Sequence, residues 1–112
     1  MQEQIEKTWL KQVAEGNEPA FRALFDAYKD RFFAVARKMT GSVYIAEEMV
    51  QETFIVLWNK RALLKKVEQP DSYLFTIFYR CLYKHFKSEA LLRKTRNELL
   101  PLVPANTDEA ED

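Results

Sequence analysis

Cysteine, histidine and glycine are scarce in this chain of 112 residues, which has one Cys, one His and two Gly. A single cysteine excludes a disulfide within the chain, and two isolated glycines exclude a glycine-rich phosphate-binding loop. No apolar run approaches the roughly 20 residues of a membrane span. The first residues lack a basic start followed by an apolar stretch, so we predict no signal peptide and expect a cytoplasmic protein without membrane contact.

Side chains suited to catalysis or metal binding are equally scarce. No Ser/His/Asp or Cys/His set can be assigned, so we predict no enzymatic activity, no catalytic residue and no cofactor. Cys81 and His85 are four residues apart, which is half of a metal site in spacing. Two ligands without two more seldom hold Zn²⁺, so we interpret Cys81 as a core residue and His85 as a boundary residue, and predict no metal.

The formal net charge is zero because segments of opposite sign cancel. Residues 60–96 hold ten basic side chains and three acidic ones, a net charge of +7, whereas residues 97–112 hold five acids and no base. A basic segment inside a neutral chain indicates a local site for a polyanion rather than general stickiness.

The hydrophobic pattern predicts an all-α fold, a compact bundle of about four helices with no sheet. A hydrophobic content of 47% suits one domain, which we place at residues 1–96, followed by an acidic, proline-containing linker or tail at 97–112. The expected helices are Thr8 to Glu15, Asn17 to about Met39, Ser42 to about Arg61, and one that starts near Pro70 to Ser72. Gly16 and Gly41 are expected to be left-handed helix caps, and Asn17 and Ser42 N-caps.

Apolar residues at helical spacing in the second helix are expected to face the core: Phe21, Leu24, Phe25, Tyr28, Phe32, Val35, Ala36 and Met39. In the third helix the core stripe is Ala46, Met49, Val50, Thr53, Phe54 and Leu57. A second face of that helix carries Glu48, Gln51, Glu52 and Ile55, which we call the acidic face. Neither glutamate has a Lys or Arg three or four residues further on, so the usual intrahelical pairing is missing and a partner's cations would supply it.

Rings and cations alternate along the fourth helix. Phe75, Tyr79 and Tyr83 recur every four residues, and Arg80, Lys84 and Lys87 lie beside them. Rings offer stacking surfaces to unpaired bases and cations follow phosphates, although the tyrosines could instead pack on the first helix. The segment from Ala62 to Asp71, which we interpret as a basic and partly apolar connecting loop, favours nucleic acid because such a loop can surround an everted base.

With these features in place, the sequence resembles region 2 of the extracytoplasmic-function (ECF) sigma factors of bacterial RNA polymerase, in the sigma-70 family. The resemblance covers roughly residues 8–95 and is carried by PAFRALFDAYKDRFFAVARKMTGS (19–42), AEEMVQETFIVLW (46–58) and DSYLFTIFYRCLYKHF (71–86). The second stretch is the most specific, being close to the family's Ala-Glu-Asp-Leu-Val-Gln-Glu-Thr-Phe run that ends in Leu-Trp.

The resemblance implies a domain that binds the RNA polymerase core and recognises and melts the promoter −10 element. In this family the third helix docks on a coiled coil of the polymerase β′ subunit, which implies that the acidic face (Glu48, Gln51, Glu52 and Ile55) binds the core. The residues implied to bind the non-template single strand are Leu63, Leu64, Lys65, Lys66, Val67, Glu68, Tyr73, Tyr79, Arg80, Tyr83, Lys84 and Lys87.

The sequence departs from the family where a −10 sequence preference would be read. Phe78, Tyr79 and Arg80 stand where the family commonly has Ala-Arg-Asn, the later acidic position is Lys84, and Tyr73 replaces the usual tryptophan. Arg and Lys favour phosphate or guanine where Asn reads a base edge bidentately, so the preference is not carried over.

Two other interpretations stay open. One is a helical protein-interaction module, for example one bound by an anti-sigma factor, in which the basic segment is only a solubilising surface. The resemblance implies an anti-sigma factor as a partner under either interpretation. The other is a general RNA-binding helical domain. Full family members continue into region 4, which reads the −35 element, and we interpret this sequence as a truncated member that is a monomer.

Overall fold

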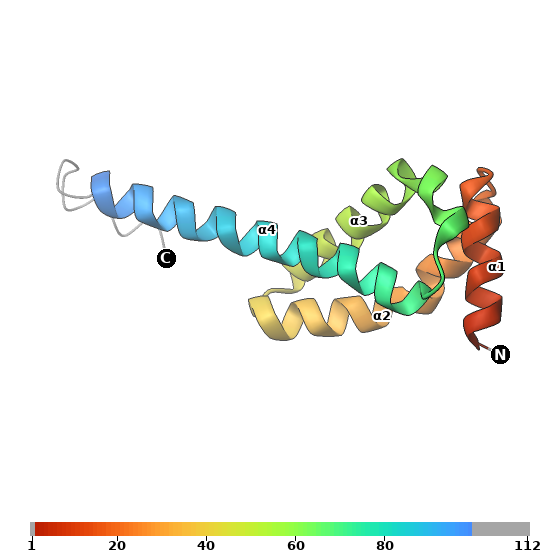
Figure 1. Ribbon diagram of the computed structural model, residues 1–112. Coiled ribbons are helices and arrows are strands. Elements are labelled where there is room, and N and C mark those ends of the chain that lie inside the picture. Colours follow the sequence, from red (N-terminus) through yellow and green to blue (C-terminus); the bar gives the residue numbers. More distant parts are fainter. Residues whose placement is uncertain (1, 100–112) are drawn as a thin grey trace. The chain divides into compact units, whose positions relative to one another are not determined.

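The computed structural model describes residues 2–99. They form α1 (Gln2–Ala14), α2 (Glu18–Thr40), α3 (Val43–Asn59), the 3-10 helix η1 (Arg61–Lys66) and α4 (Pro70–Leu99), with no strand among them (Figure 1). The all-α prediction is therefore confirmed. Residues 97–99 belong to α4, and the rest of the predicted acidic tail lies outside the described residues.

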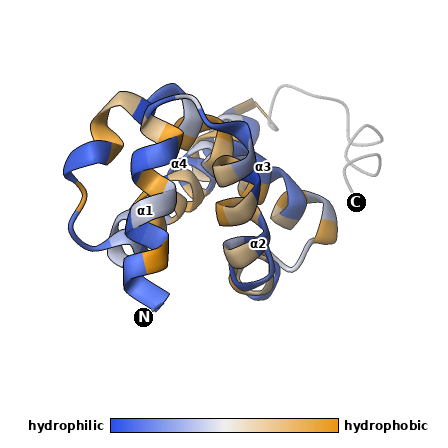
Figure 2. Ribbon diagram, turned by 90° about the vertical axis from the view of Figure 1, so that its right-hand side faces the viewer, coloured by the Kyte–Doolittle hydropathy of each residue, from blue (hydrophilic) through white to orange (hydrophobic). Residues whose placement is uncertain are grey.

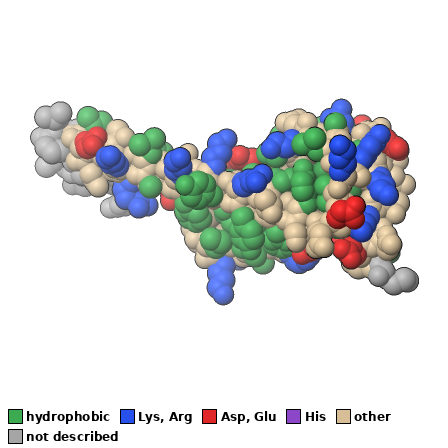
Figure 3. All heavy atoms as spheres, in the orientation of Figure 1, with side chains coloured by type: hydrophobic (Ala, Val, Ile, Leu, Met, Phe, Trp, Pro, Cys, Tyr) green, Lys and Arg blue, Asp and Glu red, His purple; other side chains and the backbone are tan. Residues whose placement is uncertain are grey.

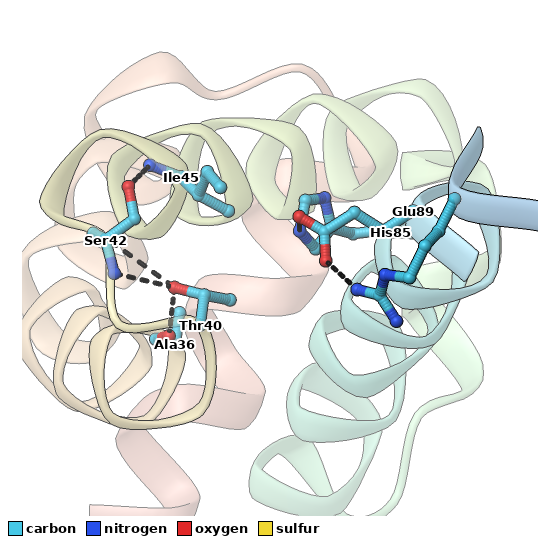
Figure 4. A network of polar contacts seen from close by, with 7 residues as sticks. Ala36, Thr40, Ser42, Ile45, His85 and Glu89 are labelled. Atoms are coloured by element: carbon cyan, nitrogen blue, oxygen red, sulfur yellow. Dashed lines mark hydrogen bonds and ion pairs between the residues drawn. The ribbon is translucent and has the colours of Figure 1, made fainter. Parts of the chain in front are cut away.

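The junction between α2 and α3 is built by the residues that the sequence singled out (Figure 4). Gly41 has a φ of +73°, and its N–H donates to the carbonyl of Arg37 at 2.8 Å. Ser42 Oγ accepts from the N–H of Ile45 at 3.1 Å, which satisfies one free donor of the first turn of α3. Thr40 Oγ1 donates to the carbonyl of Ala36 at 2.8 Å. These local bonds fix where α2 ends and α3 begins.

The junction between α1 and α2 follows the same chemistry. Asn17 Oδ1 accepts from the N–H of Ala20 at 2.8 Å, and Pro19 lies in the first turn of α2, where its missing N–H costs nothing. Gly16 has a φ of +87°, a conformation that favours glycine over residues with a Cβ. The predicted caps at both junctions are confirmed.

The chain divides into two compact units, Met1–Leu82 and Tyr83–Asp112. The first unit holds the hydrophobic core, and orange and blue segments alternate along α1, α2 and α3, as expected of amphipathic helices (Figure 2). Phe32 is fully buried and its ring lies 4.4 Å from that of Phe78 at an interplanar angle of 10°, and 4.9 Å from that of Phe75. Cys81 is 6% exposed, so its prediction as a core residue is confirmed.

Three expectations about helix bounds and helix ends need correction. The first helix begins at Gln2 rather than Thr8, because α1 packs on α2 and η1 from Glu6 onward, with Glu6, Leu10 and Val13 buried. Met39 is 52% exposed rather than in the core, because α2 buries its last residue at Ala36. The segment after α3 is not an irregular loop throughout, since residues Arg61–Lys66 form η1.

The described part of the second unit, residues 83–99, is helical. Glu89 pairs with Arg93 at 3.8 Å, and its other carboxylate oxygen lies 3.7 Å from Nε2 of His85 (Figure 4). His85 is half-buried, as expected of a boundary residue. Leu91, Leu92 and Leu99 are exposed.

No helix within residues 2–99 is long and apolar enough to cross a membrane.

Candidate functional site

The acidic face of α3 lies at the surface, opposite the stripe that enters the core. Glu48 and Gln51 are exposed, Ile55 is 59% exposed, and Glu52 is half-buried. No ion pair formed within residues 2–99 includes either glutamate. The structure therefore places two carboxylates without a cationic partner in residues 2–99, an amide and a branched apolar side chain side by side on one face.

Tyr44 extends the acidic face by one turn, which sequence reasoning missed. The residue is 69% exposed, and it precedes Glu48 by four residues on α3. A hydrogen bond from its hydroxyl to Glu48 raises the pKa of Tyr44, helped by the charge of that carboxylate. The spacing of four residues was the signal that could have found it.

A groove runs beside the acidic face, between α2 and α3. It has a volume of about 1250 Å³, and Gln51 and Ile55 of the acidic face lie along it. Rings form its apolar part, with the ring of Phe21 5.0 Å from that of Trp58 and the ring of Phe25 5.1 Å from that of Phe54. Phe21 and Phe25 were predicted to be core residues, but both are only half-buried because they line this groove.

The 3-10 helix η1 presents a mixed basic and apolar surface. Leu63 is 61% exposed, and Lys65 and Lys66 are exposed beside it. Leu64 is 1% exposed and belongs to the core, so it anchors η1 rather than offering a surface. Lys and Arg side chains gather, with hydrophobic atoms between them, over the end of the first unit where α1 and η1 lie (Figure 3).

The segment between η1 and α4 is tied to α1. Glu68 Oε1 lies 3.6 Å from Nζ of Lys7, and the Glu68 side chain is 85% exposed. Val67 is half-buried, and its N–H donates to the carbonyl of Leu64 at 3.3 Å. Among the residues predicted to bind DNA, Glu68 is thus already engaged by a lysine of the same chain.

The part of α4 in the first unit offers one ring and one cation to solvent. Tyr79 is 49% exposed, and its ring lies 5.8 Å from that of Phe75 and 5.4 Å from that of Phe78, both of its own helix. Arg80 is exposed and Tyr73 is half-buried. These contacts and the exposure of Tyr79 place its ring at the surface of α4.

In the second unit, Tyr83 is 69% exposed and Lys84 and Lys87 are exposed. No group of three or more His, Cys, Asp or Glu within residues 2–99 is placed to hold a metal ion.

The helices described here carry an acidic face on α3 and exposed basic side chains on η1 and α4. The family Sigma-70 region 2 matches residues 24–91. The match covers more than half of the chain, so the chain belongs to the sigma-70 region 2 family. The family that the sequence resembles is thereby confirmed.

Curated proteins to which the chain is similar are named ECF RNA polymerase sigma factors. The chain is 40% identical over 53 residues to the ECF RNA polymerase sigma factor SigW of Bacillus subtilis (strain 168), over 47% of this chain and 28% of that protein. It is 27% identical over 81 residues to the ECF RNA polymerase sigma factor SigK of Mycobacterium sp. (strain KMS), over 71% of this chain and 42% of that protein. The chain thus spans less than half of the length of these relatives. No solved structure matches it.

Proposed function

We propose that this chain is the region 2 domain of an ECF sigma factor and acts in transcription initiation. In this proposal α3 binds the RNA polymerase core through the β′ coiled coil, while η1 and α4 hold the non-template strand of the promoter −10 element. The observation that carries the proposal is the acidic face of α3, whose two glutamates have no cationic partner among residues 2–99.

The docking step follows from the chemistry of that face. Arginines of a partner helix would form charge-assisted hydrogen bonds with Glu48 and Glu52, and such complementarity sets both orientation and specificity. The exposed Ile55 and the rings of the neighbouring groove would bury apolar side chains of the same partner. The acidic face and the groove together suit an amphipathic helix that carries cations along one edge.

The DNA step follows from the basic and apolar surface of η1. Flipping a base out of a duplex costs a few kcal/mol, which must be offset by capture of the base and of the released strand. The exposed Leu63 would contact the flipped base, while Lys65 and Lys66 would pair with phosphates on either side. Exposed rings and cations of α4 would hold the following nucleotides, and no bond is made or broken.

Binding to purified RNA polymerase core tests the docking step. We expect Glu48→Lys with Glu52→Lys to weaken core binding at least about thirtyfold, corresponding to roughly 2 kcal/mol for charge pairs turned repulsive. The measurement is an equilibrium titration of core with fluorescently labelled protein. The matched control is Glu15→Lys with Asp30→Lys, which makes the same change in net charge at two exposed positions, one in the turn just after α1 and one on α2.

Equal core binding by both double variants, with both folded, would contradict docking through the acidic face.

The groove between α2 and α3 also favours a second candidate, a protein-interaction module held by an anti-sigma factor. That candidate predicts that a helical partner binds the chain while single-stranded −10 DNA does not bind, with or without core.

A further inference from the structure

Glu6 of α1 is a buried carboxylate that has no part in the polymerase-binding or DNA-binding surface proposed above. The residue is 4% exposed, and its Oε1 accepts a hydrogen bond from the hydroxyl of Tyr28 at 2.8 Å. Its Oε2 accepts from Nε2 of Gln2 at 3.1 Å. A buried carboxylate is costly unless its oxygens are hydrogen-bonded, and both oxygens of Glu6 are.

The hydroxyl of Tyr28 connects Glu6 to the start of α4. It lies 2.8 Å from Glu6 and 3.1 Å from Oδ1 of Asp71, although it has one hydrogen to donate. Burial raises the pKa of Tyr28, with the two carboxylates adding to the effect, so the hydroxyl keeps its proton. Arg31 completes the cluster, because its Nη1 donates to Oδ1 of Asp71 at 3.1 Å and its guanidinium lies 4.4 Å from the ring centre of Tyr28.

This cluster holds one end of the segment that the proposed function places on DNA. Asp71 follows the buried Pro70, so fixing its carboxylate fixes the point where residues 61–69 enter α4. On the other side, η1 packs against α1 and buries Leu64. Lys7, the neighbour of Glu6, reaches Glu68 at 3.6 Å. α1 therefore contacts this segment at its beginning, at Glu68 and, through Tyr28, at its end.

We propose that Glu6 is a positioning residue, which sets the shape of residues 61–69 through Tyr28 and Asp71 and so tunes their affinity for single-stranded DNA without touching it. This inference rests on the proposed function, in which residues 61–69 hold the flipped base. A segment held in its binding conformation loses less conformational freedom when DNA binds, and its affinity is correspondingly higher.

Two variants of Glu6 separate this role from charge alone. Glu6→Gln keeps an oxygen that accepts from Tyr28, and the amide of Gln2 can turn to suit the new side chain. Glu6→Leu removes the acceptor that ties Tyr28 to α1, while the Tyr28 hydroxyl can still donate to Asp71, so no buried donor is left without a partner. Tyr28→Phe removes both hydrogen bonds of the hydroxyl, the one to Glu6 and the one to Asp71, and serves where Glu6→Leu does not fold.

The test combines affinity with hydrogen exchange. With core present, Glu6→Leu should bind a fluorescein-labelled single-stranded −10 oligonucleotide about tenfold more weakly, and Glu6→Gln within about twofold of the parent. Core binding itself should be unchanged in both. The amides of Leu63, Val67 and Tyr73, which donate to carbonyls inside or beside the segment, should exchange about tenfold faster in Glu6→Leu, while those of α3 keep their protection.

Unchanged oligonucleotide affinity in folded Glu6→Leu and Tyr28→Phe would overturn the proposal. So would a uniform rise in exchange across α2 and α3, since that pattern reports lost stability and not a released segment. If the parent chain binds no oligonucleotide, the proposed function fails, and the exchange pattern alone then decides whether Glu6 positions residues 61–69.

Discussion

The ring of Tyr79 is held in place by two rings of its own helix. Its ring is half exposed, while Phe75 and Phe78 of the same helix contact it from within the first unit. A ring fixed in this way loses little conformational entropy if a base stacks on it.

Removal of the Tyr79 ring should therefore be costly. We expect Tyr79→Ala to weaken binding of a single-stranded −10 oligonucleotide, in the presence of core, by about tenfold, since one stacked base contributes roughly 1–3 kcal/mol. Tyr79→Phe keeps the ring and should bind within about twofold of the parent. Fluorescence anisotropy measures both, and equal affinities for all three proteins would show that no base stacks at this position.

Leu63 and Leu64 show that residue type alone does not decide which side chain is buried and which is exposed. The sequence places both in one basic and apolar segment, and both were predicted to contact DNA. The 3-10 geometry of η1 turns Leu64 into the core at 1% exposure and leaves Leu63 61% exposed. A short helix without a long apolar period gives no pattern from which the inward leucine could be identified.

At the scale of elements, η1 carries two adjacent exposed lysines, Lys65 and Lys66. Replacing Lys65 and Lys66 by Gln should flatten the salt dependence of oligonucleotide binding. Each lost phosphate contact lowers the slope of log K against log salt by about 0.7, hence by about 1.4 for two. Titrations between low and moderate salt measure this slope.

Two comparisons make the salt experiment specific to η1. Arg37→Gln with Lys38→Gln removes two exposed cations from the last turn of α2 and should leave the slope unchanged. Leu63→Ala should lower the affinity at every salt concentration without changing the slope, because it removes an apolar contact. A slope that stays constant in the Lys65 and Lys66 variant would mean that these lysines do not meet phosphates.

α3 was the element most completely predicted from the sequence. A period of 3.6 residues separates its core stripe from its acidic face, and Ser42 specifies its start, so both faces and the first residue follow from local rules. The groove beside it does not, because its rings come from α2 as well as α3. The burial of Glu6 escaped prediction for the same reason, since its partner Tyr28 is 22 residues away in the sequence.

At the scale of the whole molecule, Phe32 joins three helices of the first unit. It is fully buried on α2 and contacts Phe54 of α3 at 6.0 Å and Phe75 and Phe78 of α4. Phe32→Ala should lower the free energy of unfolding by about 3–5 kcal/mol, through lost burial and the cavity left behind.

Urea denaturation followed by circular dichroism measures this loss. Val43→Ala is a suitable comparison, because Val43 is 46% exposed and its truncation should change the free energy of unfolding by less than about 0.5 kcal/mol. A loss below about 1 kcal/mol for Phe32→Ala would mean that the aromatic core does not hold the helices together as described.

The lone cysteine gives the first unit a chemical reporter of its own. Cys81 is 6% exposed, so a thiol reagent reaches its sulfur only when the surrounding helices separate. Where closing is faster than modification, the rate of labelling is proportional to the fraction of open molecules, and each tenfold slowing corresponds to about 1.4 kcal/mol of opening free energy. The rate of Cys81 labelling, measured with and without a polymerase subunit or a DNA strand, would thus report how each changes the opening free energy of these helices. No further substitution or attached probe is needed.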